Sequence, residues 1–114
     1  MKIAFTTKGK EWDSEMDPRF GRTEFILIYD EEKDELTSFD NRAIADVAHG
    51  AGPQTAQKLF ELEPEVLITG NGPGGNAATV LKEAKVKIYI GAGSGTVKEM
   101  FDKYKNNELK EFAG

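Results

Sequence analysis

The chain has 114 residues, a net charge of −5 at pH 7 and no cysteine. This length suits one packed core, so we expect residues 1–114 to form a single domain. The acidic balance argues against a nucleic-acid-binding protein, because such proteins usually carry a basic surface. No apolar run approaches the roughly 18 residues that span a bilayer, and the N-terminal residues lack the pattern of a signal peptide. We therefore expect a cytoplasmic protein with no membrane contact and no thiolate metal ligand.

The first part of the chain predicts three strands. Residues 2–7 have an apolar centre, residues 24–30 form a strongly apolar run, and residues 35–39 follow after a short acidic turn. The long segment 8–23 is polar and shows no helical period. Loops of this length in a compact domain are usually either functional or disordered.

Residues 41–52 are predicted to be a loop, followed by a helix. Pro53 stands where proline favours the first turn of a helix, and Pro64 ends the helix. The positions that recur between them at helical spacing are Ala56, Leu59, Phe60 and Glu63.

The last part predicts two strand–helix units. Residues 66–69 are typical of a buried parallel strand, and residues 86–90 form the last strand. Glycine-rich turns at 70–75 and 91–95 follow these strands. The predicted apolar faces of the two helices are Ala77, Val80, Leu81 and Ala84 in the first, and Val97, Met100, Phe101 and Tyr104 in the second. Thr96 and Glu99 have the spacing of a capping box at the start of the second helix.

The resulting order, βββαβαβα, predicts an α/β fold. Two βα units need right-handed crossovers and parallel strands, whereas the short acidic turn makes strands two and three antiparallel. We expect a five-stranded mixed sheet in which strand two runs against the other four, covered by helices on both faces in three α/β/α layers. The segments 8–23 and 41–52 and both glycine-rich turns then share the edge where open α/β sheets bind ligands.

Cationic groups fall at this predicted edge. All three arginines and the only histidine lie in or beside its loops, and helix N-termini add partial positive charge and free N–H groups. This favours an anionic ligand, although Glu11, Asp13, Glu15 and Asp17 occupy the same edge. The candidate binding residues are Arg19, Phe20, Gly21, Arg22, Arg42, His49, Gly50, Gly70, Asn71, Gly72, Gly74 and Gly75.

Each of these motifs also has a purely structural interpretation. The 70–75 segment is equally typical of a tight strand-to-helix turn, because it lacks the Gly-Lys-Ser/Thr of a Walker A loop and no acidic ribose ligand follows it. Phe20 is a typical anchor for a loop with solvated arginines. A lone histidine such as His49 is more often a cap or a surface residue than a metal ligand.

Several short segments of the sequence are similar to those of a known family. These segments are Met1-Lys2-Ile3-Ala4, Phe20-Gly21-Arg22, His49-Gly50-Ala51-Gly52-Pro53, Ile68-Thr69-Gly70-Asn71-Gly72-Pro73, Val86-Lys87-Ile88-Tyr89 and Thr96-Val97-Lys98-Glu99. In their order and spacing, the chain resembles the dinitrogenase iron–molybdenum cofactor biosynthesis family over nearly its whole length. That family includes small cofactor carriers, nitrogenase accessory factors and the C-terminal domain of the cofactor-assembly radical enzyme.

The resemblance implies a ribonuclease H-like α/β/α fold in a nitrogenase accessory factor-like domain. It also implies that the protein binds an iron–sulfur or iron–molybdenum cluster, or a precursor, without catalysis, and passes it to a partner protein that receives or assembles the cluster. Members often carry a histidine just before the Phe-Gly pair, where this chain has Arg19. Guanidinium cannot ligate a metal, which leaves His49 as the metal ligand and Met16 as a remote thioether option.

Two other functions fit the residues as well. The first is a binding module for a small phosphorylated metabolite or nucleotide that uses the 70–76 segment. The second is a protein-interaction domain whose loops meet a partner enzyme.

Overall fold

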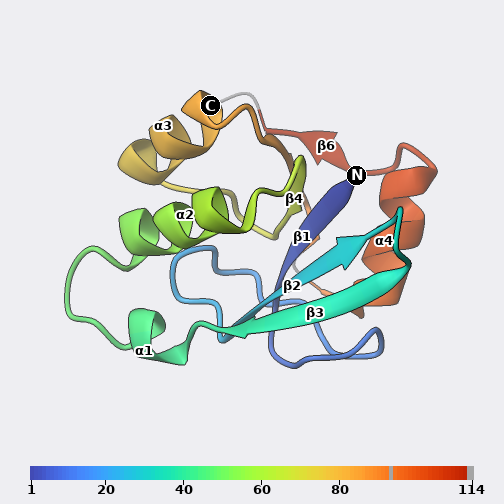
Figure 1. Cartoon of the computed structure of the whole chain (residues 1–114), viewed down its shortest axis with the longest axis horizontal. Helices are drawn as coiled ribbons and strands as arrows, with labels where there is room; N and C mark the ends of the chain where they lie inside the picture. Colours follow the sequence, from blue (N-terminus) through green and yellow to red (C-terminus); the bar gives the residue numbers. More distant parts are fainter. Residues whose placement is uncertain (93, 113–114) are drawn as a thin grey trace.

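The structure, a computed structural model, describes residues 1–92 and 94–112 (Figure 1). In this part of the chain six strands form one sheet, in the order β3-β2-β1-β4-β5-β6. The strands are β1 (Lys2–Thr7), β2 (Phe25–Asp30), β3 (Glu35–Asp40), β4 (Val66–Ile68), β5 (Lys87–Ile90) and β6 (Lys110–Glu111). The helices are α1 (Arg42–Ala45), α2 (Ala51–Leu62), α3 (Gly75–Glu83) and α4 (Val97–Lys105).

The sheet is mixed, as predicted. β2 pairs antiparallel with β1 on one side and with β3 on the other, and the β1–β4 and β4–β5 pairs are parallel. The prediction of five strands is wrong, because the sixth strand, β6, pairs antiparallel with β5. β6 has only two residues, Lys110 and Glu111, and both are exposed. So short and charged a segment has no apolar alternation from which a strand could be predicted.

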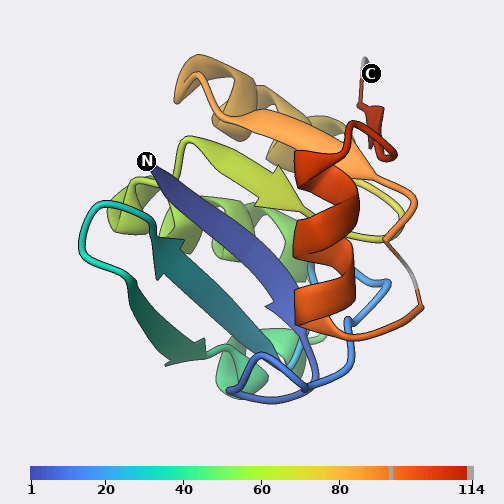
Figure 2. The same ribbon diagram turned by 90° about the vertical axis from the view of Figure 1, so that its right-hand side faces the viewer.

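Helices cover both faces of the sheet (Figure 2). On one face, Ala56 and Leu59 of α2 and Ala77 and Leu81 of α3 pack in a core cluster with buried residues of β1, β2, β4 and β5. On the other face, α4 supplies Val97 and other residues to a second cluster. This arrangement gives the three expected layers, while the ribonuclease H-like description stays a prediction.

The segment predicted as the loop 41–52 contains the single-turn helix α1, and α2 already begins at Ala51. α1 buries none of its residues, so it has no apolar period to reveal it in the sequence. A residue before the helix stabilises its first turn, because the Asp40 carboxylate accepts a hydrogen bond from the Arg42 N–H at 3.0 Å. Pro53 lies in the first turn of α2, as expected.

The helical spacing grouped Phe60 with Ala56 and Leu59, but its side chain is turned to the surface. Leu59 is completely buried, whereas Phe60 is 49% exposed. The buried stripe of α2 follows Ala51, Thr55, Ala56 and Leu59, and Phe60 lies about 100° further round the helix. The capping box of α4 is confirmed, because Thr96 accepts from the Glu99 N–H and Glu99 accepts from the Thr96 N–H.

The 8–23 segment is irregular in shape but well tied to the body of the protein. Lys8 N–H donates to the Glu15 carbonyl at 2.9 Å, and Met16 N–H donates to the Gly95 carbonyl at 2.9 Å. Trp12 packs edge-on against the ring of Tyr29, with 4.9 Å between ring centroids. The structure therefore gives this segment a defined conformation, which argues against the disordered alternative for a loop of this length. Over the described ranges, no helix has the length and apolar character needed to cross a membrane.

Candidate functional site

The loops at the C-terminal ends of β1, β4 and β5 meet at one edge of the sheet, which we call the upper edge. Asn71 N–H donates to the Pro18 carbonyl at 3.0 Å, and Gly91 N–H donates to the Gly70 carbonyl at 3.0 Å. The first of these bonds ties the 8–23 segment to the glycine-rich turn after β4, and the second ties that turn to the one after β5. Gly93 of the second glycine-rich turn lies outside the described residues.

A buried polar network fixes the 8–23 segment, which we call the first loop, to α2. Thr55 of α2 donates from Oγ1 to the Gly21 carbonyl at 2.9 Å, and Asn41 donates from Nδ2 to Thr55 Oγ1 at 3.1 Å and to the Thr23 carbonyl at 3.0 Å. The Asn41 Oδ1 atom is buried without a hydrogen-bond partner. Sequence reasoning missed both Asn41 and Thr55, because a buried polar residue in a predicted loop or on a helix has no distinguishing pattern.

The three arginines come together at the upper edge. Arg19, Arg22 and Arg42 line one cavity of about 190 Å³, together with Glu24, Ala45 and Asp46. The arginines come from the first loop and from α1, which are distant in sequence. The structure thus brings together the three arginines that the sequence singled out, whereas His49 does not line this cavity.

Two of these guanidiniums are paired with carboxylates. Arg19 holds Asp17 through Nε–Oδ1 at 3.0 Å and Nη2–Oδ2 at 2.9 Å, and this hydrogen bonding raises the pKa of Arg19. Arg42 holds Asp40 in the same two-point way, at 3.0 and 2.7 Å. Hydrogen bonds from the Arg42 side chain and backbone lower the pKa of Asp40 to about 2. Arg42 also lies over the ring of Phe25, 5.1 Å from its centroid.

Arg22 differs from the other two arginines. Its Nη1 donates to the carbonyls of Ala45 and Val47, at 2.6 and 3.0 Å, and it forms no ion pair within the described ranges. Glu24 and Asp46 line the same cavity, and neither forms an ion pair with Arg22. Arg22 is the arginine whose charge is most available to a ligand.

His49 lies on the surface, just before α2. It precedes Gly50, the N-cap of α2, whose φ of +80° is favourable for glycine. Over the described ranges, no group of three or more His, Asp or Glu side chains is arranged to hold a metal ion. The role of His49 as a metal ligand therefore stays a prediction.

Two other predicted residues are inside the protein. Met16 is 2% exposed and belongs to the core cluster beneath α4, so the thioether option for a cluster ligand is wrong in this conformation. Phe20 is 4% exposed and packs in the cluster beneath α2 and α3. Phe20 anchors the loop that carries Arg19 and Arg22.

The glycines of the candidate site fall into two groups. A Cβ on Gly70 would lie 2.5 Å from Pro18 Cα, and a Cβ on Gly21 would lie 2.7 Å from the Gly52 backbone, so both glycines permit a close approach of loops. Gly72 has a φ of +81° and faces the Phe112 ring. A Cβ on Gly74 or Gly75 would meet nothing within 4 Å. These two glycines, at the start of α3, border open space together with the exposed Asn71.

A family model and two solved structures more than 30% identical match most of this chain. The family model described as dinitrogenase iron–molybdenum cofactor matches residues 1–107. The apo form of the orange protein from Desulfovibrio gigas is 31% identical and has a TM-score of 0.92, with 99% of this chain and 93% of that chain covered. A Thermotoga protein described as a candidate NifB protein is 35% identical and has a TM-score of 0.85, with 99% and 94% covered. A third solved structure, 17% identical with a TM-score of 0.72, shares the fold. A comparison with curated proteins found no match.

Proposed function

The chain belongs to the dinitrogenase iron–molybdenum cofactor family, and we propose that it is a non-catalytic carrier for an anionic metal–sulfur cluster. The cargo is an iron–sulfur or iron–molybdenum type cluster, or a precursor, which the protein passes to a partner that receives or assembles it. The family, the orange protein and the Thermotoga protein support a cofactor-related role. The observation that carries the proposal is the meeting of Arg19, Arg22 and Arg42 in one cavity at the upper edge.

The proposed binding is mainly electrostatic. Guanidinium has N–H donors in a fixed planar fork and cannot ligate a metal, so the arginines would donate hydrogen bonds to the outer atoms of the cluster. Asp17 and Asp40 fix the planes of two of the forks, while Arg22 keeps unused donors. Because the chain has no cysteine, His49 is the metal ligand in this proposal. A cargo held without thiolates is suited to release.

The test is anaerobic titration of the protein with extracted iron–molybdenum cofactor, followed by visible absorbance. We expect saturable binding that weakens as salt is added, because salt screens exposed charges. Arg22→Gln should raise the dissociation constant by roughly tenfold, as expected for the loss of a hydrogen bond to a charged group. His49→Ala should change the absorbance spectrum of the bound cluster.

The matched control is Lys33→Gln, which removes one positive charge from the exposed turn between β2 and β3, at the opposite edge of the sheet. It should bind like the wild type. If the double variant Arg22→Gln/His49→Ala also binds like the wild type, the assignment of these residues is wrong. If the wild-type protein does not bind the cluster at all, the carrier proposal fails.

One observation favours a second candidate, a module for a small phosphorylated metabolite or nucleotide. Gly74 and Gly75 leave open space at the start of α3, and Gly74 provides no side-chain cap for the free N–H groups there. A thermal-shift series distinguishes the two candidates, because a ligand that binds only the folded state raises the melting temperature. Stabilisation by nucleotides but not by the cluster would favour this second function.

A further inference from the structure

Asn71 and Gly72 form an Asn-Gly pair in the turn between β4 and α3, at the upper edge. Asn71 is exposed and Gly72 is half-buried. Gly72 has a φ of +81°, a conformation that glycine adopts easily because it has no Cβ. The Asn71 N–H donates to the Pro18 carbonyl at 3.0 Å, so the pair has a defined position at this edge.

The side-chain amide of Asn71 and the N–H group that follows it are both available for reaction. Within the described ranges, the Asn71 side chain forms no hydrogen bond, and the Gly72 N–H donates to no acceptor. Because glycine has no side chain, no bulky group keeps these two groups apart. The Gly72 nitrogen can therefore approach Cγ, the carbonyl carbon of the Asn71 side chain.

The other asparagines lack this combination. Asn41 is buried, and Asn76 lies in the helical backbone of α3. Asn106 and Asn107 are exposed, but the N–H that follows each of them already donates to a backbone carbonyl, at 3.1 and 2.8 Å. Asn71 is therefore the asparagine whose surroundings favour a reaction with its own backbone.

We infer that Asn71 is a site of self-modification, at which the chain slowly converts this asparagine to aspartate and isoaspartate. After losing its proton, the Gly72 nitrogen attacks Asn71 Cγ and forms a C–N bond that closes a cyclic imide. The bond from Cγ to the side-chain nitrogen breaks, and this nitrogen leaves as ammonia. Water then opens the imide at either carbonyl, which gives aspartate or isoaspartate. The net change replaces an amide by a carboxylate, consumes water and needs no oxidant, reductant or second protein.

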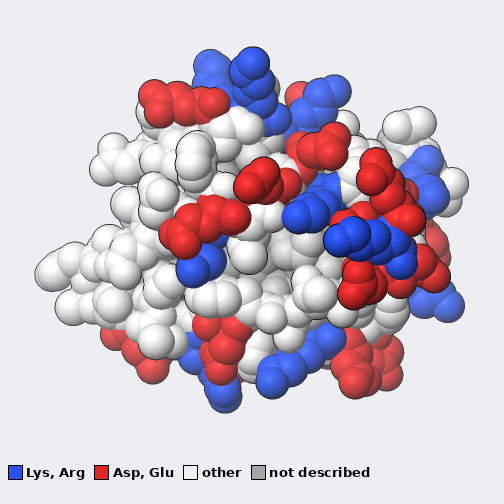
Figure 3. All heavy atoms as spheres, in the orientation of Figure 1, with Lys and Arg blue, Asp and Glu red and all other residues white. Residues whose placement is uncertain are grey.

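The product places a charge where the chain otherwise has none. No Asp, Glu, Lys or Arg occurs in residues 66–81 or in residues 47–57. Figure 3 shows uncharged side chains over the starts of α2 and α3, at the left of the view. Each modified molecule gains one negative charge, which changes the net charge at pH 7 from −5 to −6. The modification thus alters the charge of the upper edge and leaves the core as it is.

The effect of this charge on binding rests on the proposed function. The free N–H groups at the start of α3 and the arginines of the same edge favour an anion, whereas a carboxylate at residue 71 opposes one by like-charge repulsion. Deamidation is therefore an irreversible switch that lowers the affinity of older molecules for an anionic cargo.

The first test needs no cargo. The wild-type protein is incubated in warm, mildly alkaline buffer, digested with trypsin and analysed by mass spectrometry with peptide fragmentation, and an unincubated sample gives the baseline. We expect the acid form to build up at residue 71 alone, at a rate that rises in proportion to the hydroxide concentration, with isoaspartate in the product. Asn71→Gln should stay unmodified over the same time, because the longer side chain closes a ring less readily. A folded wild-type protein without the acid form at residue 71, or with equal conversion at Asn106 and Asn107, overturns the proposal.

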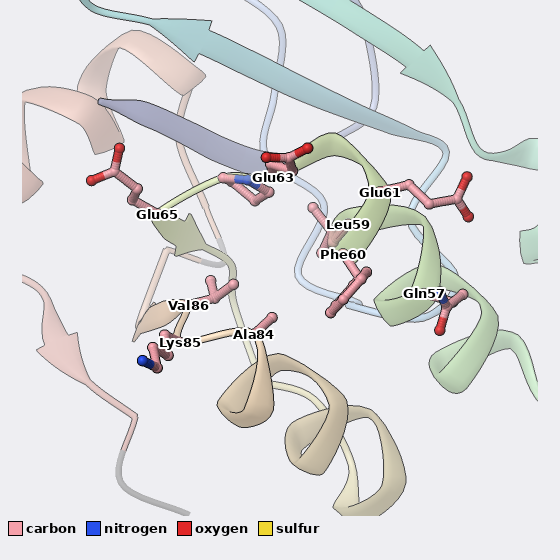
Figure 4. Close-up of a pocket in the computed structure, with 10 residues that line it drawn as sticks. Gln57, Leu59, Phe60, Glu61, Glu63, Glu65, Ala84, Lys85 and Val86 are labelled. Atoms are coloured by element: carbon pink, nitrogen blue, oxygen red, sulfur yellow. The ribbon is translucent and has the colours of Figure 1, made fainter.

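The second test measures the effect on the cargo. Asn71→Asp has the same added charge, and in the anaerobic titration with iron–molybdenum cofactor it should raise the dissociation constant roughly threefold or more, as expected for one like charge near an exposed anion. The control is Gln57→Glu, the same amide-to-acid change on α2, beside a groove of about 660 Å³ between α2 and the turn into β5 (Figure 4). This variant should bind like the wild type.

The two tests separate the failure of this inference from the failure of the carrier proposal. If the wild type binds the cluster and Asn71→Asp binds it equally well, the regulatory role of the modification is overturned. A wild-type protein that binds no cluster contradicts the carrier proposal, whereas the mass-spectrometric test still decides whether Asn71 is modified.

Discussion

Asp17 and Arg19 form a two-point ion pair in which the carboxylate is completely buried and the guanidinium is 54% exposed. The Asp17 carboxylate also accepts a hydrogen bond from the Arg19 N–H at 3.0 Å. Arg19 thus pairs with the buried charge of Asp17 and also lines the cavity at the upper edge. This double role links the stability of the first loop to the proposed binding site.

Removing the Arg19 guanidinium should destabilise the protein. Arg19→Ala takes away both side-chain donors to the buried carboxylate of Asp17 and leaves the backbone N–H of residue 19. We expect the free energy of unfolding to fall by about 1–3 kcal/mol, toward the lower end because solvent reaches the guanidinium side of the pair. Urea denaturation measures the change. The double variant Asp17→Asn/Arg19→Ala should lose less stability than Arg19→Ala, because no buried charge is left unpaired. Equal losses would show that the unpaired charge of Asp17 is not what destabilises the Arg19→Ala variant.

The exposed pair of Asp40 and Arg42 should be visible in an acid titration. The pKa of Asp40 is lowered from 3.8 to about 2 in the folded protein. A carboxyl with a lowered folded-state pKa adds stability that is fully present above its unfolded pKa and is lost as the pH falls through the folded pKa. The contribution of Asp40 should therefore disappear between about pH 4 and about pH 2.

Arg42→Gln should return the pKa of Asp40 toward its ordinary value, and an NMR titration of the carboxyl carbon measures this directly. Lys58→Gln, which removes a charge from α2, is the control and should leave the Asp40 titration unchanged. An Asp40 pKa that is still near 2 in Arg42→Gln would show that the Arg42 guanidinium is not what lowers it.

Two glycines of the same turn should respond differently to alanine. A Cβ at Gly70 would lie 2.5 Å from Pro18 Cα and 2.9 Å from the Pro18 carbonyl oxygen, so Gly70→Ala must push the first loop away. We expect a loss of about 1–3 kcal/mol, the usual cost of overpacking. Gly74→Ala meets nothing within 4 Å and should change stability by only a few tenths of a kcal/mol. Thermal unfolding of the two variants side by side decides the point, and similar melting temperatures would contradict it.

The buried network around Asn41 should hold the first loop in place. Asn41→Ala removes both donors to Thr23 and Thr55, and we expect a loss of about 1–3 kcal/mol. Amide exchange should become faster in the 8–23 segment and at the start of α2 than in β4 and β5. Uniformly faster exchange over the whole chain would instead indicate a general loss of stability. Exchange unchanged from the wild type would show that Asn41 does not hold the loop.

The elements that could be predicted from the sequence are those with an apolar period or a local signal. β1, β2 and β4 are strongly apolar, and the capping box of Thr96 and Glu99 marks the start of α4. α1 and β6 could not be predicted, because α1 buries no residue and β6 consists of Lys110 and Glu111 alone. These two elements form because the chain around them brings them into position.

The candidate site could be predicted in outline for a topological reason. Parallel strands bring the loops after them to one edge, so the sequence predicts that Arg19, Arg22 and Arg42 lie together. The sequence could not show that Asp17 and Asp40 pair with two of these arginines, since such pairs depend on side-chain directions in irregular loops. For the same reason, the sequence leaves Met16 as a ligand option although its side chain packs in the core.

The short β6 strand covers the edge of the sheet that β5 would otherwise expose. An open β5 would offer its N–H and C=O groups, next to the apolar side chains of Ile88 and Ile90, to any extended chain that came near. β6 occupies these groups, and the Phe112 N–H extends the pairing to the Ile88 carbonyl at 2.7 Å. The new edge carries Lys110 and Glu111, and charge on so short a strand discourages further strands from adding. The protein thereby protects itself against aggregation through strand pairing at this end of the sheet.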